Sequence, residues 1–297
     1  MALRIDYKHL AALDAVIREQ SFDKAAKRLH ITQSAVSQRL SQLEQSVGQR
    51  LLTRSLPMAP TAQGEHLLRH ARQVALLEHE LAQKMKADAD SYQVVAVAVS
   101  NDTLAWFVRT CMQWIPHSPR SLLQVYVDDE SRTQQMMRNG TVLGCISQHA
   151  AALPGGEVTE LGAMRFYCVA TPDFAARHFP DGLTDEALAC APAVLVSHDD
   201  PLHFDFLAQQ HPRFTGAFPF HLIPSINEFV DVIAAGAGFG LVSNLLIGER
   251  LKRGLLVDLS PARPFHLPLY WHRWAMESAL ISRLTESLTA AAAGLLD

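Results

Sequence analysis

Apolar residues in the first 45 positions recur at helical spacing and predict three short helices. Ser21 is a favoured N-cap for the second helix, over about 22–29, and Thr32 is one for the third. Within each helix the apolar side chains fall on one face, which predicts a buried stripe. The three stripes comprise Leu10, Leu13, Ala15, Val16 and Ile17; Phe22, Ala25, Ala26 and Leu29; and Ala35, Val36, Leu40 and Leu43.

A longer apolar stripe follows between Thr61 and about Ala87, in a stretch without proline. Its members lie three or four positions apart and are Leu67, Ala71, Val74, Leu77, Leu81 and Met85. This spacing predicts one long helix. The helix either faces a core or pairs with a second copy of the chain, and pairing is favoured because the stripe runs well past the compact helical head.

From residue 94 onward, short apolar runs alternate with helical patterns. The expected strands are 94–99, 122–127, 142–147, 166–171, 193–197, 220–225, 239–243, 255–259 and 267–271, with helices at about 103–115, 132–138, 226–235 and 245–253. The run 94–99 is continuously apolar, as in a buried parallel strand. The alternation predicts an α/β body, and ligands of such sheets bind outside the carboxyl ends of the strands.

The distribution of charge also separates the first 60 residues from the rest of the chain. Residues 1–60 hold nine Lys and Arg against five Asp and Glu, a net charge of +4, whereas the remainder holds 17 against 25, a net charge of −8. A basic head on an acidic body favours a polyanion-binding head. We therefore expect a DNA-binding domain at 1–60, a linker and dimerisation helix at 61–90 and a ligand-binding body at 91–297.

No apolar run approaches the roughly 20 residues of a membrane span, and the first residues lack a secretory signal pattern. We therefore expect a cytoplasmic protein without a membrane partner; the family resemblance given below adds that it is bacterial and nucleoid-associated. The four cysteines, Cys111, Cys145, Cys168 and Cys190, include no CxxC pair. Reduced and mostly buried thiols are expected rather than a zinc knuckle, with a redox switch as the alternative.

The exposed side of the third helix carries side chains suited to reading DNA. These candidates are Gln33, Ser34, Ser37, Gln38 and Arg39. Gln and Arg can pair bidentately with base edges, and Ser can bond to bases or phosphates. Because a recognition helix contacts bases mainly with its N-terminal residues, the pattern favours a helix-turn-helix over a plain helical hairpin.

The stretch AAKRLHITQSAVSQRLSQLEQSVGQRLLTRS, from Ala25, and the later PTAQGEHLL resemble the LysR-type transcriptional regulators. The resemblance implies a winged helix-turn-helix in which Arg54 and the turn SLPMAP form the wing beside the phosphates. That turn carries no Lys or Arg, so Arg50 or Arg54 must supply the wing's charge. The expected partners are double-stranded promoter DNA, a second copy in a homodimer or dimer of dimers, and RNA polymerase.

For the body, the resemblance implies two lobes hinged like periplasmic binding proteins, with the ligand between them. The first lobe is expected at about 91–167 and 268–297, and the second at about 168–267. The chain should cross between the lobes near 168–171 and return near 265–270.

Polar residues at the strand ends are the candidate ligand contacts. Ser100, Asn101 and Thr103 open a helix and suit a carboxylate, whereas Asp102 opposes an anion unless it points away or holds an ammonium group. Asp128, Asp129 and Glu130 would attract a cation, with a solvated loop as the alternative. Further candidates at comparable positions are Ser147, Ser197, His198, Ser225, Asn227 and Glu228.

The segments RTQQMMRNGTVLGCIS, LGAMRFYCVATPDFAARHFPDGLT and LYWHRWAMES resemble the arginine/lysine-responsive branch of the same family. This implies L-lysine or L-arginine as effector, control of basic amino-acid export or metabolism genes, and no cofactor. The alternative is an architectural or replication-modulating DNA-binding protein with weak effector dependence. The sign of regulation and the choice between lysine and arginine stay open.

Enzyme motifs are weak in this chain. GAGFGL at 236–241 fails the dinucleotide pattern because residue 241 is Leu, and it lies between a helix and a strand rather than the reverse. HLLRH at 66–70 lacks the glutamate of a zinc protease. HDDPLHFD at 198–205 holds possible metal ligands, but a polar loop end is the simpler interpretation. We therefore expect neither catalysis nor a resident metal. An enzyme on an α/β scaffold remains a third hypothesis, beside the ligand-responsive regulator and the architectural DNA-binding protein.

Overall fold

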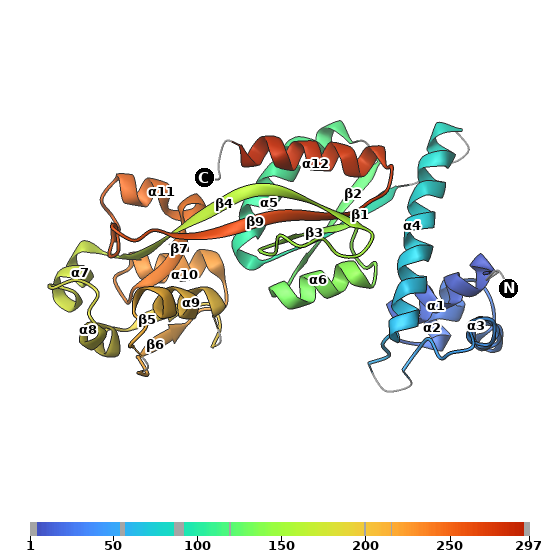
Figure 1. Ribbon diagram of the computed structural model, residues 1–297, viewed down its shortest axis with the longest axis horizontal. Helices are drawn as coiled ribbons and strands as arrows, with labels where there is room; N and C mark the ends of the chain where they lie inside the picture. The colour runs from blue at the N-terminus through green and yellow to red at the C-terminus, as the bar shows by residue number, and fades with distance from the viewer. Residues whose placement is uncertain are drawn as a thin grey trace.

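The computed structural model describes residues 5–53, 57–85, 92–118, 120–198, 200–214 and 216–293. A helical head lies at one end, the long helix α4 crosses beside it, and an elongated α/β body extends away from both (Figure 1). Within the described ranges, no helix is both long and apolar enough to cross a membrane.

The head contains three helices around one apolar core: α1 (Tyr7–Glu19), α2 (Phe22–Arg28) and α3 (Gln33–Val47). The side chains of Ser21 and Thr32 cap α2 and α3 by accepting hydrogen bonds from the backbone N–H groups of Lys24 and Ala35. The predicted helices and caps are therefore confirmed. The predicted stripes need a correction, because Ile17, Phe22, Leu29 and Ala35 are half-buried, while their other members are buried.

The cap of α3 is expected to contribute measurably to the stability of the head. Thr32 Oγ1 accepts from Ala35 N at 3.2 Å. Thr32→Ala should lower the free energy of unfolding of the head by about 1 kcal/mol, because an orphan N–H at the helix start loses its acceptor. Urea denaturation followed by circular dichroism measures this change, with Thr32→Ser as the control that keeps the hydroxyl. Equal stability of the two variants would show that the cap contributes nothing.

The segment after α3 forms a short antiparallel turn where the wing is expected. Leu52 and Pro60 form an isolated bridge, and the backbone N–H of Thr53 donates to the carbonyl of Ala59 at 2.8 Å. The Thr53 hydroxyl closes the same turn by accepting from Ala59 N at 3.0 Å. Arg54, the residue assigned to the wing, lies outside the described residues.

Helix α4 (Ala62–Lys84) shows the expected single long helix, but its apolar stripe is not buried uniformly. Leu67 and Leu68 belong to the core of the head, and Leu76 packs in the main core of the body. In contrast, Leu77, Leu81 and Met85 are 44%, 56% and 69% exposed. The C-terminal half of the stripe is thus an uncovered apolar face.

The part of the body beside α4 has three parallel strands, β1 (Gln93–Val99), β2 (Ser121–Val127) and β3 (Gly144–Ser147). Helices α5 (Asn101–Trp114) and α12 (Ala279–Ala292) lie on one side of this sheet and α6 (Glu130–Arg138) on the other (Figure 1). The 3-10 turn η1 (Ile115–His117) follows α5. The buried parallel strand predicted at 94–99 is confirmed, whereas the strand expected at 142–147 begins only at Gly144.

Two long antiparallel strands, β4 (Gly156–Ala170) and β9 (Phe265–Trp274), connect the two ends of the body. Their pairing shifts at Gly162, which adopts a φ of 112° that favours glycine. Sequence patterns predicted strands over only part of each, because an amphipathic strand gives a weaker signal than a continuous apolar run.

The far part of the body contains β7 (Gly240–Ser243), β8 (Val257–Asp258) and the parallel pair β5 (Ala193–Leu195) and β6 (Phe220–Leu222). Its helices are α7 (Pro172–His178), α8 (Asp185–Cys190), α9 (Pro201–Gln210), α10 (Ile226–Ala234) and α11 (Asn244–Lys252). GAGFGL joins α10 to β7 as a helix-to-strand turn, as expected. The run at 255–259 yields a strand of only two residues. The architecture is the predicted two-lobed α/β fold.

Candidate functional site

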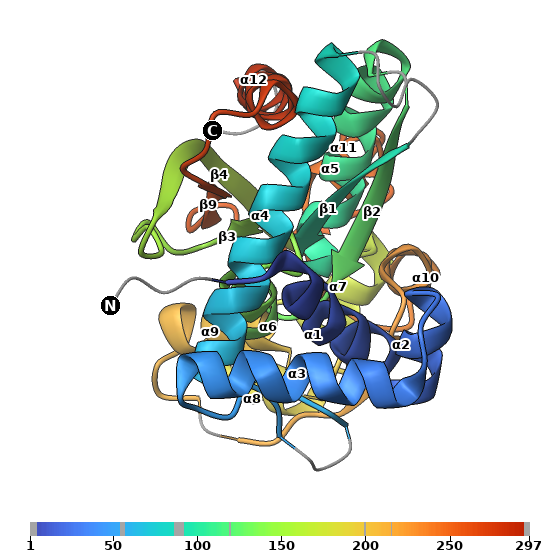
Figure 2. The ribbon, with the colours of Figure 1, turned by 90° about the vertical axis from the view of Figure 1, so that its right-hand side faces the viewer.

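Helix α3 lies on the side of the head that faces away from the body (Figures 1 and 2). Gln33, Ser34 and Gln38 are exposed, and Ser37 is half-buried beside them. Arg39 is also half-buried and lies at the border of the buried stripe, since it is one residue from Leu40. The structure therefore brings four of the five candidates on α3 onto one accessible surface, with Arg39 at its edge.

Cationic side chains on α2 extend this surface. Lys24 and Lys27 are exposed, as is Arg50 after α3, whereas Arg28 is paired with Glu19 at 3.0 Å. The first helix of a helix-turn-helix crosses the DNA backbone, where lysines can bind phosphates. The two lysines were missing from the sequence-based site, although the excess of basic residues in the head pointed to such contacts.

The second candidate site lies where the two lobes face each other, and we call it the lobe junction. Strand β3 ends at Ser147, opposite Tyr270, which pairs with Glu160 of β4. Strand β7 approaches from the other side and ends at Ser243, opposite Phe166 of β4. The two strand ends therefore point toward each other across a stretch of β4 of roughly 20 Å.

The other parallel strands join the same arrangement. Strands β1 and β2 run parallel to β3, while β5 is bridged in parallel to Phe239, next to β7, and β6 is parallel to β5. The carboxyl ends of both sets of strands thus face the lobe junction, the position at which open α/β sheets bind ligands.

The N-terminus of α5 brings polar groups of the first lobe to this junction. Ser100 is the N-cap, yet its side chain makes no capping hydrogen bond and instead lies 3.1 Å from the Thr103 hydroxyl. Thr103 is buried, while Asn101 is exposed. The helix start therefore presents backbone N–H groups and hydroxyls suited to a carboxylate.

Asp102, on the same turn of α5, is the most perturbed acid of the junction. Part of its side chain reaches solvent, but the surrounding protein desolvates it, and the charge of Asp200 acts in the same direction. Together they raise the pKa of the Asp102 carboxyl from 3.8 to about 7. Asp200 precedes α9 of the opposite lobe, so the two carboxyl groups form an acidic pair across the junction that a cation would relieve.

Asp128 and Asp129 close β2 with local partners. Asp129 caps α6 by accepting from Arg132 N at 2.9 Å, and the Arg132 guanidinium lies 3.5 Å from Asp128 and 3.8 Å from Asp129. A cationic side chain of the protein thus already offsets part of this negative charge. The two acids are less available to a ligand than their sequence pattern suggested.

Glu130 and Ser147 meet at the end of β3. The Ser147 hydroxyl donates to Glu130 Oε1, and the backbone N–H of Gln148 donates to the same oxygen at 2.7 Å. Gln134 Nε2 donates to Ser147 Oγ at 3.0 Å. Glu130 therefore ties the start of α6 to the end of β3, and Ser147 is buried within this network.

The candidates of the second lobe are more dispersed. His198 is exposed, and its ring lies edge-on to Phe220 with centroids 5.6 Å apart, while Ser197 is half-buried. At the start of α10, the Ser225 hydroxyl donates to Glu228, which lowers the pKa of that exposed carboxyl. Asn227 is exposed on the same turn.

Asp200 belongs to the SHDD strand end and was weighed as a metal ligand, but it was not among the effector candidates; the structure brings it near enough to Asp102 for its charge to act on that carboxyl. Asp200 caps α9 by accepting from His203 N, and its second oxygen accepts from Val196 N at 3.4 Å. His203 is buried against aromatic rings, and burial lowers its pKa to about 4. The Asp-Pro start of α9 was a recognisable cap signal in SHDDP, but nothing local related it to Asp102.

A repeated tripeptide was also missed. Val-Ser-Asn stands at 99–101 and again at 242–244, in each case where a strand ends and a helix begins. Neither serine caps its helix through its side chain. Ser243 Oγ and Asn244 Oδ1 are buried without a hydrogen-bond partner. The two lobes thus present similar polar helix starts toward the junction.

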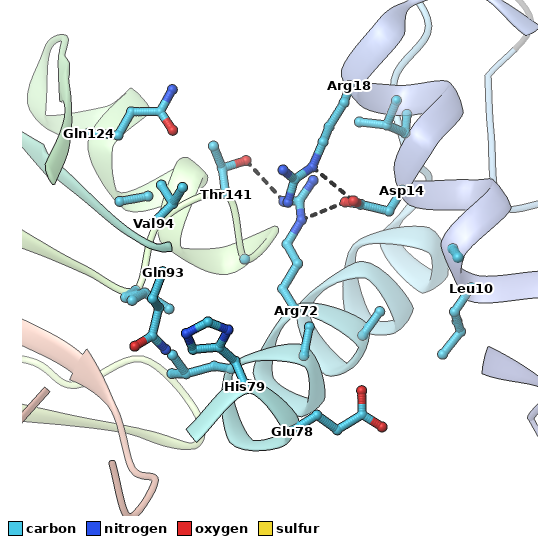
Figure 3. A pocket seen from close by; sticks show the side chains of 18 of the residues that line it. Leu10, Asp14, Arg18, Arg72, Glu78, His79, Gln93, Val94, Gln124 and Thr141 are labelled. Carbon is cyan, nitrogen blue, oxygen red and sulfur yellow. Dashed lines mark hydrogen bonds and ion pairs between the residues drawn. The ribbon is translucent and has the colours of Figure 1, made fainter. Parts of the chain in front are cut away.

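Two cavities lie away from the lobe junction. The larger, of about 790 Å³, opens between α1, α4 and one face of β1 and β2 (Figure 3). Arg72 of α4 projects into it between Asp14 and Thr141. The smaller, of about 380 Å³, lies between the ends of α5 and α12.

Metal binding finds little support in the side chains whose placement is described. Within those ranges no group of three or more His, Cys, Asp and Glu is arranged to hold an ion. In the segment at 198–205, Asp199 lies outside the described residues, and Asp200 and His203 make the contacts described above.

Known proteins resemble both parts of the chain. Residues 7–65 match the bacterial regulatory helix-turn-helix proteins of the lysR family, and residues 88–293 match the LysR substrate binding domain. The HTH-type transcriptional regulator ArgP of Aeromonas salmonicida is 44% identical over 286 residues, covering 96% of this chain and 95% of the relative.

Solved structures agree over nearly the full length. ArgP from Mycobacterium tuberculosis superposes with a TM-score of 0.88 at 36% identity, covering 99% of both chains. Full-length LysG from Corynebacterium glutamicum with bound effector Arg superposes with a TM-score of 0.83 at 31% identity, covering 98% of this chain and 99% of that chain. The chain therefore belongs to the LysR family of ligand-responsive, DNA-binding transcriptional regulators.

Proposed function

We propose that the protein senses a basic amino acid, L-arginine or L-lysine, at the lobe junction and couples its binding to control of a promoter. The observation that carries this proposal is the acidic pair of Asp102 and Asp200 across the junction. A guanidinium or side-chain ammonium group between them would relieve their repulsion. The effector carboxylate would bind at the start of α5, near Ser100 and Thr103.

The ArgP and LysG relatives support the same effector class, since the LysG structure contains bound Arg. We infer that the lobes separate to admit the ligand, because the carboxyl ends of both sets of strands face the junction. Closure about the β4–β9 ribbon would then hold the ligand from both sides. The lobes we assign are 91–167 with 268–297, and 168–267.

On DNA, we propose that Gln33, Ser34, Ser37, Gln38 and Arg39 read or position the major groove, with Arg54 binding beside it. Two copies would pair through the uncovered apolar face of α4, since large apolar patches on a folded protein usually mark interfaces. A two-fold dimer, or a dimer of dimers, can read two half-sites one helical turn apart. Contact with RNA polymerase would then convert occupancy into transcription.

Calorimetry of the full chain against L-arginine, L-lysine and L-leucine tests the effector class. Saturable binding of arginine or lysine, but not of leucine, is expected, because a leucine side chain cannot offset the charge of the acidic pair. A matched measurement compares binding to promoter DNA and to random DNA, with and without the amino acid. Equal affinities in all four cases would instead favour an architectural DNA-binding protein without effector control.

A further inference from the structure

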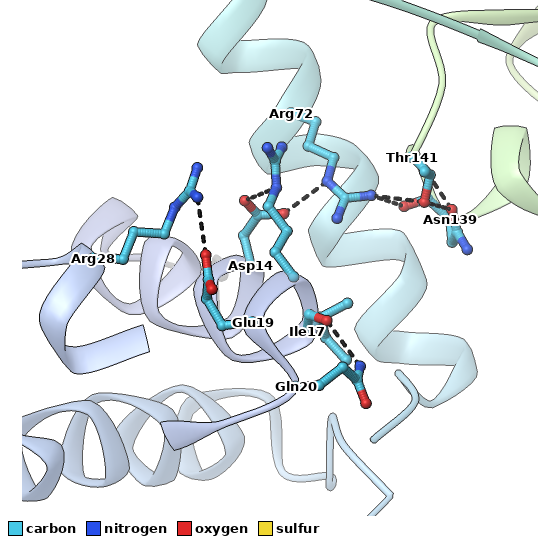
Figure 4. Close-up of polar contacts among 9 residues, drawn as sticks. Asp14, Ile17, Glu19, Gln20, Arg28, Arg72, Asn139 and Thr141 are labelled. Carbon is cyan, nitrogen blue, oxygen red and sulfur yellow. Dashed lines mark hydrogen bonds and ion pairs between the residues drawn. The ribbon is translucent and has the colours of Figure 1, made fainter. Parts of the chain in front are cut away.

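Arg72 of α4 joins the head to the body through one side chain (Figure 4). Its Nε donates to Asp14 of α1 at 2.7 Å. Its terminal nitrogen donates to the Asn139 carbonyl at 3.1 Å and to the Thr141 hydroxyl at 3.2 Å. The side chain is only 12% exposed, so these charge-assisted bonds are partly shielded from solvent. We call this set of contacts the Arg72 clasp.

The turn that receives Arg72 is built to approach α4 closely. Gly140 adopts a φ of +72°, and a Cβ at this position would lie 2.7 Å from the Cα of Arg69. The Asn139 side chain holds the turn by accepting from Thr141 N at 3.0 Å and from the Thr141 hydroxyl at 2.6 Å. The backbone of the turn is therefore seated directly against the linker helix.

Helix α6 connects this turn to the lobe junction. The helix begins at Glu130, which binds Ser147 and Gln148 at the end of β3, and it ends at Arg138, next to the turn. Nine helical residues span roughly 14 Å as a rigid rod. A displacement of the β3 end on ligand binding would therefore move the turn as well.

We propose that Arg72 is a positioning residue that transmits the state of the lobe junction to the DNA-binding head. The route runs from the end of β3 through α6 and its C-terminal turn to Arg72, and from Arg72 to α1. This inference rests on the proposed function, because it takes the effector to bind at the junction. Arg72 itself touches neither the effector nor the DNA.

The chain offers a matched control for the clasp. Arg18 also binds Asp14, at 2.8 Å, but it is 48% exposed and lies one helical turn from Asp14 on the same helix. Arg18→Ala removes a charge partner of Asp14 without touching the bridge to the body. Arg72→Met keeps the apolar stem and removes the guanidinium, whereas Thr141→Val and Thr141→Ser separate loss of the hydroxyl from a change of shape.

The experiment measures promoter affinity of the full chain by fluorescence anisotropy, with and without saturating L-arginine. Allosteric coupling in proteins typically changes affinity by about 5–150-fold, and we expect the wild type and Arg18→Ala to fall in this range. Arg72→Met and Thr141→Val should still bind arginine in calorimetry. In these two variants, however, arginine should change the promoter affinity less than about twofold. Thr141→Ser should keep the wild-type ratio of promoter affinities with and without arginine. Unfolding curves confirm that each variant is folded.

A second readout needs no effector. Donor and acceptor dyes on α2 and α12 report the distance between head and body, and Arg72→Met should shift or broaden its distribution while Arg18→Ala should not. The inference would be overturned if Arg72→Met kept both the wild-type effect of arginine on promoter affinity and the wild-type distance between head and body. It would also be overturned if Arg18→Ala lost as much of the arginine effect as Arg72→Met. A wild type that binds no basic amino acid would overturn the proposed function instead, and the distance measurement would still decide whether Arg72 positions the head.

Discussion

The affinity for arginine is expected to fall by about tenfold for each unit that the pH drops below 7. The pKa of the Asp102 carboxyl is raised to about 7 by burial and by the charge of Asp200. Below this pH the carboxyl is protonated in the free protein, so a cationic ligand must displace the proton. Above it the carboxyl is already ionised, and the affinity should level off.

Calorimetry in two buffers of different ionisation enthalpy measures the proton release directly. Near pH 6 close to one proton per bound arginine is expected for the wild type, and almost none for Asp102→Asn, which should also lose affinity above pH 7. His203 should not contribute, because burial lowers its pKa to about 4 and keeps it neutral. Asp129→Asn is the control, since Asp129 caps α6 and lies beside Arg132.

The same carboxyl gives the free protein a defined dependence of stability on pH. The pKa of Asp102 is higher in the folded protein than its unfolded value of 3.8. The contribution of this carboxyl to the stability of the fold is therefore fully present below pH 3.8 and declines as the pH rises to about 7. Asp102→Asn should remove this decline. An arginine affinity that is flat from pH 5 to 8 would contradict the placement of the cation beside Asp102.

Replacement of Gln33 by alanine is expected to cost about 1–3 kcal/mol on the preferred promoter site, or roughly 5- to 150-fold in affinity. Gln33 is the first residue of α3 and is exposed, so its amide can pair bidentately with adenine in the major groove. The loss should be confined to sites that carry the contacted base. Arg39→Ala should cost a similar amount if Arg39 pairs with guanine.

Gel-shift titrations at constant salt on the preferred site, on sites changed at single bases and on random DNA distinguish these roles. Gln45→Ala is the control, because Gln45 is exposed on the same helix but lies three turns farther from its N-terminus. A loss that is equal on every DNA would assign the side chain to phosphate contact instead. Such a contact should also reduce the salt dependence of binding.

Part of the candidate site could be predicted because its signals are local. The caps Ser21 and Thr32, and the apolar spacing between them, depend on residues within one or two helical turns. The positions of Ser100 and Ser147 at the ends of strands could be predicted from apolar runs of a few residues. The long strands β4 and β9 were only partly predicted, because their pairing partners are about a hundred residues apart and their burial is mixed.

The acids of the lobe junction show where local reasoning failed. Asp128 and Asp129 follow β2, which is exposed or half-buried along its length, and Arg132, three to four positions later, lies beside both acids. Asp200 was not among the effector candidates, although its charge acts on Asp102 from the opposite lobe. The pairing with Arg132 follows the i, i+3 and i, i+4 spacing and could have been read from the sequence. The interaction of Asp200 with Asp102 joins residues 98 positions apart, so it depends on the fold.

The sequence by itself determined the helical head, the exposed face of α3 that we propose reads DNA, the long linker helix and the α/β class of the body, because periodicity, capping and charge act over a few residues. Only the tertiary structure decided the facing of Asp102 and Asp200 and the Arg72 clasp. Arg72 is 58 positions from Asp14 and 69 from Thr141, and only the packing of three separate elements brings these groups within hydrogen-bond distance.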